Sequence, residues 1–406
     1  MNKFKIFVIS SLSVILIFLV FVYAKMSLNP IMQEMAPTEN PTQAPIEPTE
    51  EILTAEQIAE QKIEAFMQKM SIEQKIGQLF FCAFRQDSGG GDVVSADEGI
   101  IDTIKERGIG GVILFSENIT EANQVAGYIA ELQAASDIAL FVGIDEEGGR
   151  VFRTGALDVP RLPPALSIGD TGDAQNARDA AATIAGYLVP LGFNMDFAPV
   201  ADVFTNPLNT VIGDRAFSSN PNVAAQMVAA YVAGLFEGGI LPTLKHFPGH
   251  GDTIEDSHYS AAVTNKSLEE LYLCEFVPFR EGIAAGAPFV MVGAVQAPNV
   301  TGDELPAIFS GYLIGEILRG ELEFSGIVIT DALDMGAVAN YYSPEEAAVM
   351  AVLAGVDMLL MPADFELAYF GLLGAVNSGV ISTERIDESV RRILTQKYRA
   401  GIWGLD

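Results

Sequence analysis

The chain has 406 residues, of which 50% are hydrophobic and 19% are charged, and 53 acidic against 23 basic side chains give it a formal net charge of -30. This composition excludes a mainly disordered chain, and the negative charge argues against a nucleic-acid partner. Cys82 and Cys274 both lie in apolar surroundings and are expected to be buried free thiols, with a disulfide as the unsupported alternative; no Cys/His spacing indicates zinc.

Residues 1–26 are predicted to be a signal anchor or a signal peptide. Lys3 and Lys5 precede an apolar run over residues 6–24, which as a helix would span roughly 28 Å, about one hydrocarbon core. The basic residues favour an amino terminus inside and the remaining chain outside the membrane. A small-x-small pattern at residues 22–24 also fits a cleavage site. The sequence therefore predicts an extracytoplasmic protein, either anchored by this helix or secreted after cleavage.

Residues 27–51 are predicted to be a disordered linker. Its second half, PTENPTQAPIEPTEE, is rich in proline, glutamate and threonine and has almost no large apolar side chain. Such a segment is semi-extended and solvated, and it would hold a folded domain away from a membrane.

From residue 52 to residue 406, short apolar runs alternate with amphipathic helical stretches. The runs are continuous rather than alternating in polarity, which is typical of parallel strands covered on both faces. The predicted strands span residues 77–84, 110–115, 139–145, 194–200, 242–247, 289–295, 326–332 and 357–362. They indicate a (β/α)8 TIM-type barrel. The alternative is a doubly wound sheet, but the segment DSGGGDVV lacks the glycine fingerprint that such a sheet would carry.

Helices are predicted between these strands and at the end of the chain. Ser343 is expected to cap one of them, with Pro344 at the first helical position and Glu346 completing a capping box. The predicted helices include residues 123–136, 222–239, 267–286, 343–355 and 387–401.

Charged residues follow several of the predicted strands. Asp145 ends one strand, Lys245 and His246 end another, and Asp331 ends a third. In a barrel of this kind, chemistry occurs at the carboxyl ends of the strands. We therefore expect these side chains to meet at one mouth of the barrel.

All three histidines of the chain lie in one stretch, KHFPGHGDTIEDSH, from Lys245 to His258. The spacing of His246 and His250 would suit two metal ligands on a helix, but Pro248 and its neighbouring glycines disfavour a helix, so no metal and no cofactor is predicted. A mobile, glycine-rich loop is expected instead. Asp256 would orient His258 as a general acid and base, whereas His250 is expected to shape the loop.

Asp331 is the candidate nucleophile. A carboxylate at the mouth of a barrel can attack the anomeric carbon of a sugar. Asp334, three residues later, is the alternative, but a position directly at the strand end points more directly at a ligand.

From about Ala55 to Trp403, the chain resembles glycoside hydrolase family 3, in particular its NagZ-type β-N-acetylglucosaminidases. The most specific motif is KHFPGHGDTIEDSH, and five others follow the same order as in the family. These are GIDEEGGRVFR (143–153), NMDFAPVADV (194–203), VIGDRAF (211–217), GIVITDALDM (326–335) and AGVDMLLMP (354–362).

The resemblance implies a (β/α)8 barrel and a role for each matching residue. It makes Asp331 the nucleophile and Asp256 with His258 the acid/base dyad. It also implies that a terminal N-acetylglucosamine is held by Asp145, Arg153, Arg215, Lys245 and His246. The implied activity is retaining exo-β-N-acetylglucosaminidase action, with peptidoglycan or muropeptide fragments as carbohydrate substrates.

Two positions depart from the family pattern. Ala332 stands where many relatives have a second aspartate, and Ala294 where many have a histidine. Both are expected near the sugar subsite, where they would change specificity. The alternatives that stay open are another family 3 glycosidase, an N-acetylglucosamine phosphorylase, and a non-enzymatic carbohydrate-binding surface protein. The oligomeric state does not follow from the sequence.

Overall fold

A computed structural model describes residues 53–254 and 262–404, and Leu53–Asp406 form one compact unit. Its centre is a parallel sheet of eight strands in the order β10-β1-β2-β3-β4-β5-β7-β9. A parallel bridge between Ile329 and Met358 joins the two ends of this order and nearly closes the barrel. The strands are β1 (Phe80–Ala83), β2 (Gly111–Leu114), β3 (Phe141–Ile144), β4 (Met195–Asp196), β5 (Leu241–Phe247), β7 (Phe289–Val292), β9 (Ile327–Thr330) and β10 (Leu359–Leu360).

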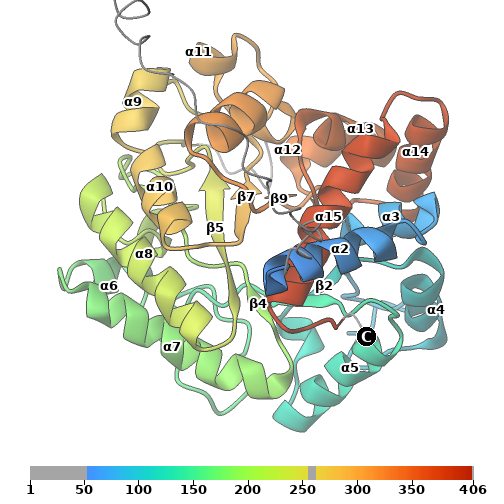
Figure 1. Ribbon diagram of the computed structural model, residues 1–406. Helices are drawn as coiled ribbons and strands as arrows, with labels where there is room; N and C mark the ends of the chain where they lie inside the picture. Colours follow the sequence, from blue (N-terminus) through green and yellow to red (C-terminus); the bar gives the residue numbers. More distant parts are fainter. Residues whose placement is uncertain (1–52, 255–261, 405–406) are drawn as a thin grey trace, which may run out of the picture. The chain divides into compact units, whose positions relative to one another are not determined.

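Helices surround the sheet, with α7, α8 and α10 side by side along one flank and α2 and α3 against the carboxyl-terminal α15 (Figure 1). A short parallel pair, β6 (Ala262–Val263) and β8 (Val295–Gln296), lies outside the barrel sheet. The longer helices are α2 (Ala55–Met67), α3 (Ile72–Gln78), α4 (Glu98–Arg107), α5 (Ala122–Ala134), α7 (Ala174–Leu191), α8 (Pro221–Glu237), α10 (Phe276–Ala284), the π-helical η4 (Tyr312–Glu321), α13 (Pro344–Ala354), α14 (Phe365–Asn377) and α15 (Thr383–Arg399). The shorter ones are η1 (Ser116–Asn118), α6 (Ala165–Gly169), η2 (Gly213–Arg215), α9 (Leu268–Leu273), α11 (Pro298–Thr301), η3 (Ala307–Phe309) and α12 (Gly336–Ala339).

Aromatic side chains from opposite strands fill the barrel. The rings of Phe81 and Phe197 are 5.3 Å apart, and those of Phe141 and Phe289 are 5.2 Å apart, both in edge-to-face contact. Gly143 makes this packing possible, since a Cβ atom there would lie 2.7 Å from the ring of Phe197. The barrel is thus a packed core, and any ligand must bind at one of its ends.

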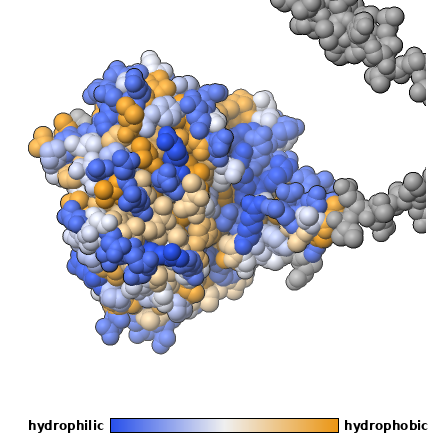
Figure 2. Space-filling view, turned by 60° about the vertical axis from the view of Figure 1, so that its left-hand side comes forward, coloured by the Kyte–Doolittle hydropathy of each residue, from blue (hydrophilic) through white to orange (hydrophobic). Residues whose placement is uncertain are grey.

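Hydrophilic and apolar side chains are mixed over the molecular surface in the view of Figure 2. Single exposed apolar residues such as Leu208 and Leu273, each 70% exposed, are normal for a soluble domain surface. This face therefore shows no simple division into an apolar and a polar half.

The predicted barrel is confirmed, and each predicted strand overlaps an observed one, although β5 begins at Leu241, one residue before the predicted range. The helix expected over residues 267–286 is wrong in one respect, because it is broken between α9 and α10 at Cys274 and Glu275. Pro278 explains the break: it has no N–H, and its ring would clash with the carbonyl group of residue 274 in a continuous helix. The Ser343 capping box is present as expected.

The predicted signal anchor and linker, residues 1–51, lie outside the described residues. Among the helices of residues 53–254 and 262–404, none has the length and apolar character that crossing a membrane requires. Of the two cysteines, Cys82 is buried as expected, whereas Cys274 is only half-buried; both are free thiols.

Candidate active site

A pocket of about 410 Å³ opens at the carboxyl ends of the strands. Asp145 follows β3, Lys245 and His246 belong to the end of β5, and Asp331 follows β9. All four side chains line the pocket, together with Arg153 and Arg215. The structure therefore brings together six of the eight predicted site residues from distant parts of the sequence.

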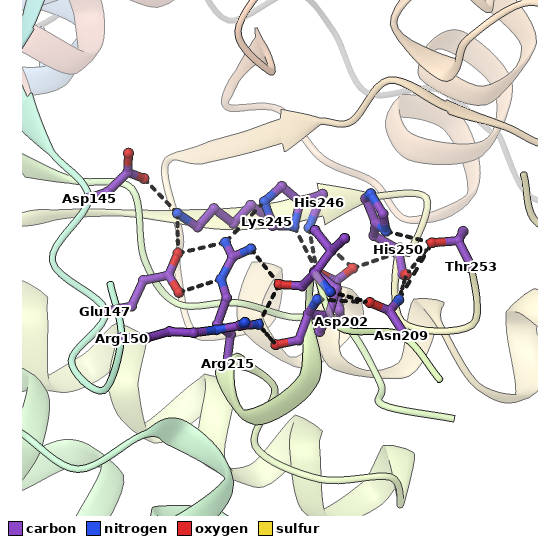
Figure 3. A network of polar contacts seen from close by, with 12 residues as sticks. Asp145, Glu147, Arg150, Asp202, Asn209, Arg215, Lys245, His246, His250 and Thr253 are labelled. Atoms are coloured by element: carbon purple, nitrogen blue, oxygen red, sulfur yellow. Dashed lines mark hydrogen bonds and ion pairs between the residues drawn. The ribbon is translucent and has the colours of Figure 1, made fainter. Parts of the chain in front are cut away.

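Lys245 lies at the centre of a buried ionic cluster (Figure 3). Its Nζ atom is 2.7 Å from Asp145 Oδ1 and 2.6 Å from Glu147 Oε1, and its side chain is only 3% exposed. Burial alone would lower the pKa of Lys245, but these two carboxylates outweigh it and raise the pKa above its usual value. Lys245 is thus a fixed, charged donor at the pocket wall.

Glu147 joins Lys245 to Arg215. The guanidinium group of Arg215 donates through Nε and Nη2 to the two oxygens of Glu147, both at 2.8 Å. Burial would raise the pKa of Glu147, but the charges of Arg215 and Lys245 outweigh it and hold the pKa below its usual value. This bidentate pair fixes the plane of the guanidinium group, which a single hydrogen bond would not.

Glu147 is a site residue that the sequence analysis missed. The segment DEEGGR offered three consecutive carboxylates, and only the one at the strand end, Asp145, was singled out. The middle one, Glu146, turns away into the protein, where it accepts hydrogen bonds from Thr154 Oγ1 at 2.6 Å and Tyr187 Oη at 2.9 Å. Glu146 therefore holds the loop in shape, while Glu147 faces the pocket.

The segment that carries Arg215 is held by two polar side chains. Arg150 donates to the carbonyl oxygens of residues 210–212 at 2.6–2.9 Å. Asn209 accepts from the backbone N–H groups of residues 211 and 212 and donates to the carbonyl oxygen of His250 at 2.7 Å. The loops after β3, β4 and β5 are thereby tied to one another around the pocket.

Asp202 is a second residue that the sequence analysis missed as part of the site. It is fully buried and lies 2.7 Å from His246 Nδ1 and 2.7 Å from the backbone nitrogen of His250. Burial would raise the pKa of Asp202, but the interactions with His246 and His250 outweigh it and lower the pKa. A buried carboxylate thus supports the histidine that lines the pocket.

Asp331 stands at the rim of the same pocket. Its backbone nitrogen continues the barrel ladder to Val292 O at 2.8 Å, and its Oδ1 accepts from Ala332 N at 2.9 Å. The side chain is half-buried, whereas the alternative nucleophile, Asp334, is exposed although it also lines the pocket. Asp331 is therefore the more enclosed of the two carboxylates, and its role as the nucleophile stays a prediction.

Arg153 lies farther out than the other predicted sugar contacts. Its Nη2 atom is 3.7 Å from Asp145 Oδ2, and its guanidinium group is 5.4 Å from the ring of Phe115. Arg85 lies over the same ring, at 4.5 Å, and also lines the pocket. Two arginines therefore flank one aromatic ring at the pocket.

The predicted dyad of Asp256 and His258 lies outside the described residues. In the preceding part of the loop, Pro248 to Thr253, five of the six residues are buried, so this part lacks the exposure expected of a mobile loop. A Cβ atom at Gly251 would lie 1.9 Å from Val203 O, so the glycine serves close packing there rather than mobility. His250 has the loop-shaping contacts expected of it, with Nδ1 2.7 Å from Thr253 Oγ1.

The two departures from the family pattern differ in position. Ala332 lines the pocket, as expected. Ala294 is fully buried and is not among the lining residues, so it does not itself contact the pocket. Within the described ranges, no group of three or more His, Cys, Asp or Glu side chains is arranged to hold a metal ion.

A larger groove, of about 780 Å³, lies at the opposite end of the barrel, where β5, β7 and β9 begin. It contains none of the predicted site residues, and its arginines 391, 392 and 399 are paired with carboxylates. Size alone would select this groove, but the chemistry selects the pocket at the carboxyl ends.

The model of the glycosyl hydrolase family 3 N-terminal domain matches residues 71–396. The chain belongs to glycosyl hydrolase family 3. The family resemblance drawn from the motifs is therefore confirmed.

Family 3 relatives extend the comparison. β-Hexosaminidase A of Pseudoalteromonas piscicida is 33% identical over 367 residues, which are 81% of this chain and 61% of that protein. A solved family 3 β-N-acetylglucosaminidase from Paenibacillus sp. str. FPU-7 has a TM-score of 0.78 at 40% identity and is matched over 82% of this chain and 63% of its own. The β-glucoside phosphorylase BglX, bound to 2FGlc, has a TM-score of 0.77 at 26% identity over 86% of this chain and 62% of its own. The chain thus spans less than two thirds of each of these relatives.

Proposed function

We propose that this family 3 member is a retaining exo-β-N-acetylglucosaminidase that removes terminal β-linked N-acetylglucosamine. The observation that carries the proposal is that one pocket is lined both by a strand-end carboxylate, Asp331, and by the charged donors Lys245 and Arg215. The names of the Pseudoalteromonas and Paenibacillus relatives support the choice of sugar.

In this mechanism, Asp331 attacks the anomeric carbon and forms a covalent glycosyl-enzyme. His258, oriented by Asp256, protonates the leaving oxygen and then deprotonates the water that releases the sugar. Retaining hydrolysis requires such a pair on opposite faces of the ring. An imidazole has its proton available near neutral pH without the raised carboxyl pKa that most glycosidases need.

In this proposal, charged side chains that are held in place at the pocket bind the sugar. Lys245 and Arg215 donate hydrogen bonds to ring hydroxyls or to the acetamido carbonyl. Asp145 accepts hydrogen bonds from the sugar hydroxyls. Because Glu147 holds Lys245 and Arg215 in place before the ligand arrives, little ordering is required on binding.

The proposed natural substrates are peptidoglycan or muropeptide fragments. Arg85 and Arg153, both close to the ring of Phe115, would favour an aglycone that carries a carboxylate. The test compares kcat/KM for a neutral aglycone with that for the same sugar carrying a carboxylate aglycone. Arg85→Ala should lower only the second, and an equal fall for both would contradict this assignment.

The proposed location is extracytoplasmic, through the apolar run of residues 6–24. The test is amino-terminal sequencing of the mature protein together with membrane fractionation. A retained amino terminus in the membrane fraction indicates an anchor, and a new amino terminus near residue 25 indicates a cleaved signal. A cytosolic protein with an intact amino terminus would contradict the proposal.

The activity is tested with a chromogenic β-N-acetylglucosaminide on residues 53–406. Asp331→Ala should lose activity by several orders of magnitude at every pH, and His258→Ala should lose roughly 10²–10⁴-fold. A chelator should change nothing. Near-normal turnover of His258→Ala would overturn the dyad assignment.

Phosphorolysis is the second candidate, favoured by the similarity to the β-glucoside phosphorylase. Products formed with and without inorganic phosphate distinguish the two reactions. Hydrolysis predicts free sugar at the same rate in both, whereas sugar 1-phosphate formed only with phosphate would establish the alternative.

A further inference from the structure

His246 has different chemical partners at its two ring nitrogens (Figure 3). Nδ1 lies 2.7 Å from a carboxylate oxygen of Asp202. Nε2 lies 3.5 Å from Nη2 of Arg215, at the limit of hydrogen-bond distance, and the residue lines the pocket. Nδ1 therefore faces a hydrogen-bond acceptor, and Nε2 faces a hydrogen-bond donor.

These partners determine the position of the proton. An ionised carboxylate only accepts hydrogen bonds, so Nδ1 must carry the hydrogen. A guanidinium group only donates, so Nε2 must present its lone pair. A proton on Nε2 would instead point at Arg215 and create two adjacent like charges or two opposed donors.

We propose that Asp202 is a positioning residue that holds His246 as the Nδ1–H tautomer, so that Nε2 accepts a hydrogen bond from a substrate hydroxyl. The proposal deepens the proposed function, because the hydroxyl belongs to the terminal sugar. It assigns His246 a role opposite to that of its neighbours Lys245 and Arg215, which can only donate.

The arrangement makes the pocket selective for hydroxyl groups. A sugar hydroxyl accepts from one neighbour and donates to another, and so satisfies both a cationic donor and the Nε2 lone pair. A fluorine or ether oxygen at the same position can accept but has no hydrogen to donate. A site built to pair with a hydroxyl rejects such an analogue because its own polar group is left unpaired.

Asp202 also has a purely structural contact, the backbone nitrogen of His250 at 2.7 Å. Asp202→Asn keeps an oxygen for that contact, but its amide can donate to Nδ1. The substitution should then move the hydrogen of His246 to Nε2. This variant separates the tautomer from the fold of the loop.

The first experiment observes the tautomer directly in the absence of substrate. Full-length protein labelled with [15N]histidine at about pH 8 has three imidazoles to assign. Their assignment uses His246→Gln, His250→Gln and His258→Gln. The expected spectrum of the wild type has a protonated Nδ1 and an unprotonated Nε2 for His246. The opposite tautomer or an imidazolium at this pH would overturn the proposal, whatever the activity of the protein.

The second experiment measures kcat/KM for Asp202→Asn alone and in the His246→Gln background. If Asp202 acts through the histidine ring, the first substitution should cost about tenfold or more in the wild type and at most about twofold in the second background. Equal losses in both backgrounds would overturn the proposal and assign Asp202 to the loop alone. Failure of the wild type to hydrolyse any β-N-acetylglucosaminide would count against the proposed function, while the tautomer would still be decided by the spectrum.

Discussion

Glu147 is a single buried carboxylate that holds two cations 2.6–2.8 Å away. Removing its charge leaves Lys245 with Asp145 alone and leaves Arg215 without the carboxylate with which it pairs. The residue therefore stabilises the fold and shapes the pocket at once.

Glu147→Gln should lower the free energy of unfolding by about 3–5 kcal/mol and reduce kcat/KM by roughly 10²-fold, because a neutral amide cannot hold both cations in place. Urea unfolding and chromogenic assays measure the two effects. The control is Asp214→Asn. Asp214 pairs with Arg150 and both side chains are 45% exposed, so the free energy of unfolding should change by less than about 1 kcal/mol. Similar small effects for both variants would contradict the central position of Glu147.

At the scale of single residues, the sequence predicted the site residues at strand ends but not the buried carboxylates that hold them in place. Asp145, Lys245, His246 and Asp331 were found because parallel strands bring their carboxyl ends together. Asp202 was missed because its role depends on burial against His246, a contact 44 residues away along the chain. No local pattern distinguishes such an aspartate from a solvated one.

At the scale of elements, the continuous apolar runs predicted where the strands lie along the chain. Helix boundaries were less secure, and the break between α9 and α10 depended on one proline inside an otherwise amphipathic stretch. The glycine-rich loop shows the same limit, because glycine permits both mobility and close packing, and only the tertiary contacts of Gly251 decide between them.

Gly143→Ala tests the packing of β3 inside the barrel. The added methyl group would lie 2.7 Å from the ring of Phe197 and 3.1 Å from that of Phe81, so the variant should be less stable by about 1–3 kcal/mol. The matched control is Gly127→Ala in helix α5, where nothing lies within 4 Å and alanine should stabilise by about 0.5–1 kcal/mol. Urea unfolding measures both, and an unchanged Gly143→Ala would contradict the packing.

Helix α15 places Lys397 at the amino-terminal end of the barrel, where it is fully buried. Its Nζ atom donates to Gln78 Oε1 at 2.8 Å and lies 5.1 Å from the centre of the Phe141 ring. Burial lowers the pKa of Lys397 well below its ordinary value. The pKa of Lys397 is near 10.4 in the unfolded chain and lower in the folded protein, so between these two values the unfolded chain binds more protons. The free energy of unfolding therefore increases as the pH rises through this range.

Lys397→Met should accordingly be more stable than the wild type at pH 7, on the order of 1 kcal/mol, because no amine has to be buried. The difference should shrink as the pH is raised toward 10. Denaturant unfolding at several pH values measures it, with the exposed Lys69→Met as the control. A constant difference across this range would contradict the lowered pKa.

At the scale of the whole molecule, one nearly closed barrel brings the described site residues to the same end. Three strands, β3, β5 and β9, end at the same pocket, although their residues are separated by up to 186 positions from Asp145 to Asp331. The fold class followed from the alternation of strands and helices. The substrate did not follow from the fold, because barrels of this type support many chemistries, and it depended on the family motifs and on the charges in the pocket.

In the proposed reaction, Asp331 becomes covalently bound to the sugar. The direct measurement is peptide mass mapping after reaction with a 5-fluoro N-acetylglucosaminyl fluoride, which slows release of the intermediate. We expect one sugar adduct on the peptide that contains Asp331, and none in Asp331→Ala. A stoichiometric adduct on Asp334 or on another carboxylate would contradict it.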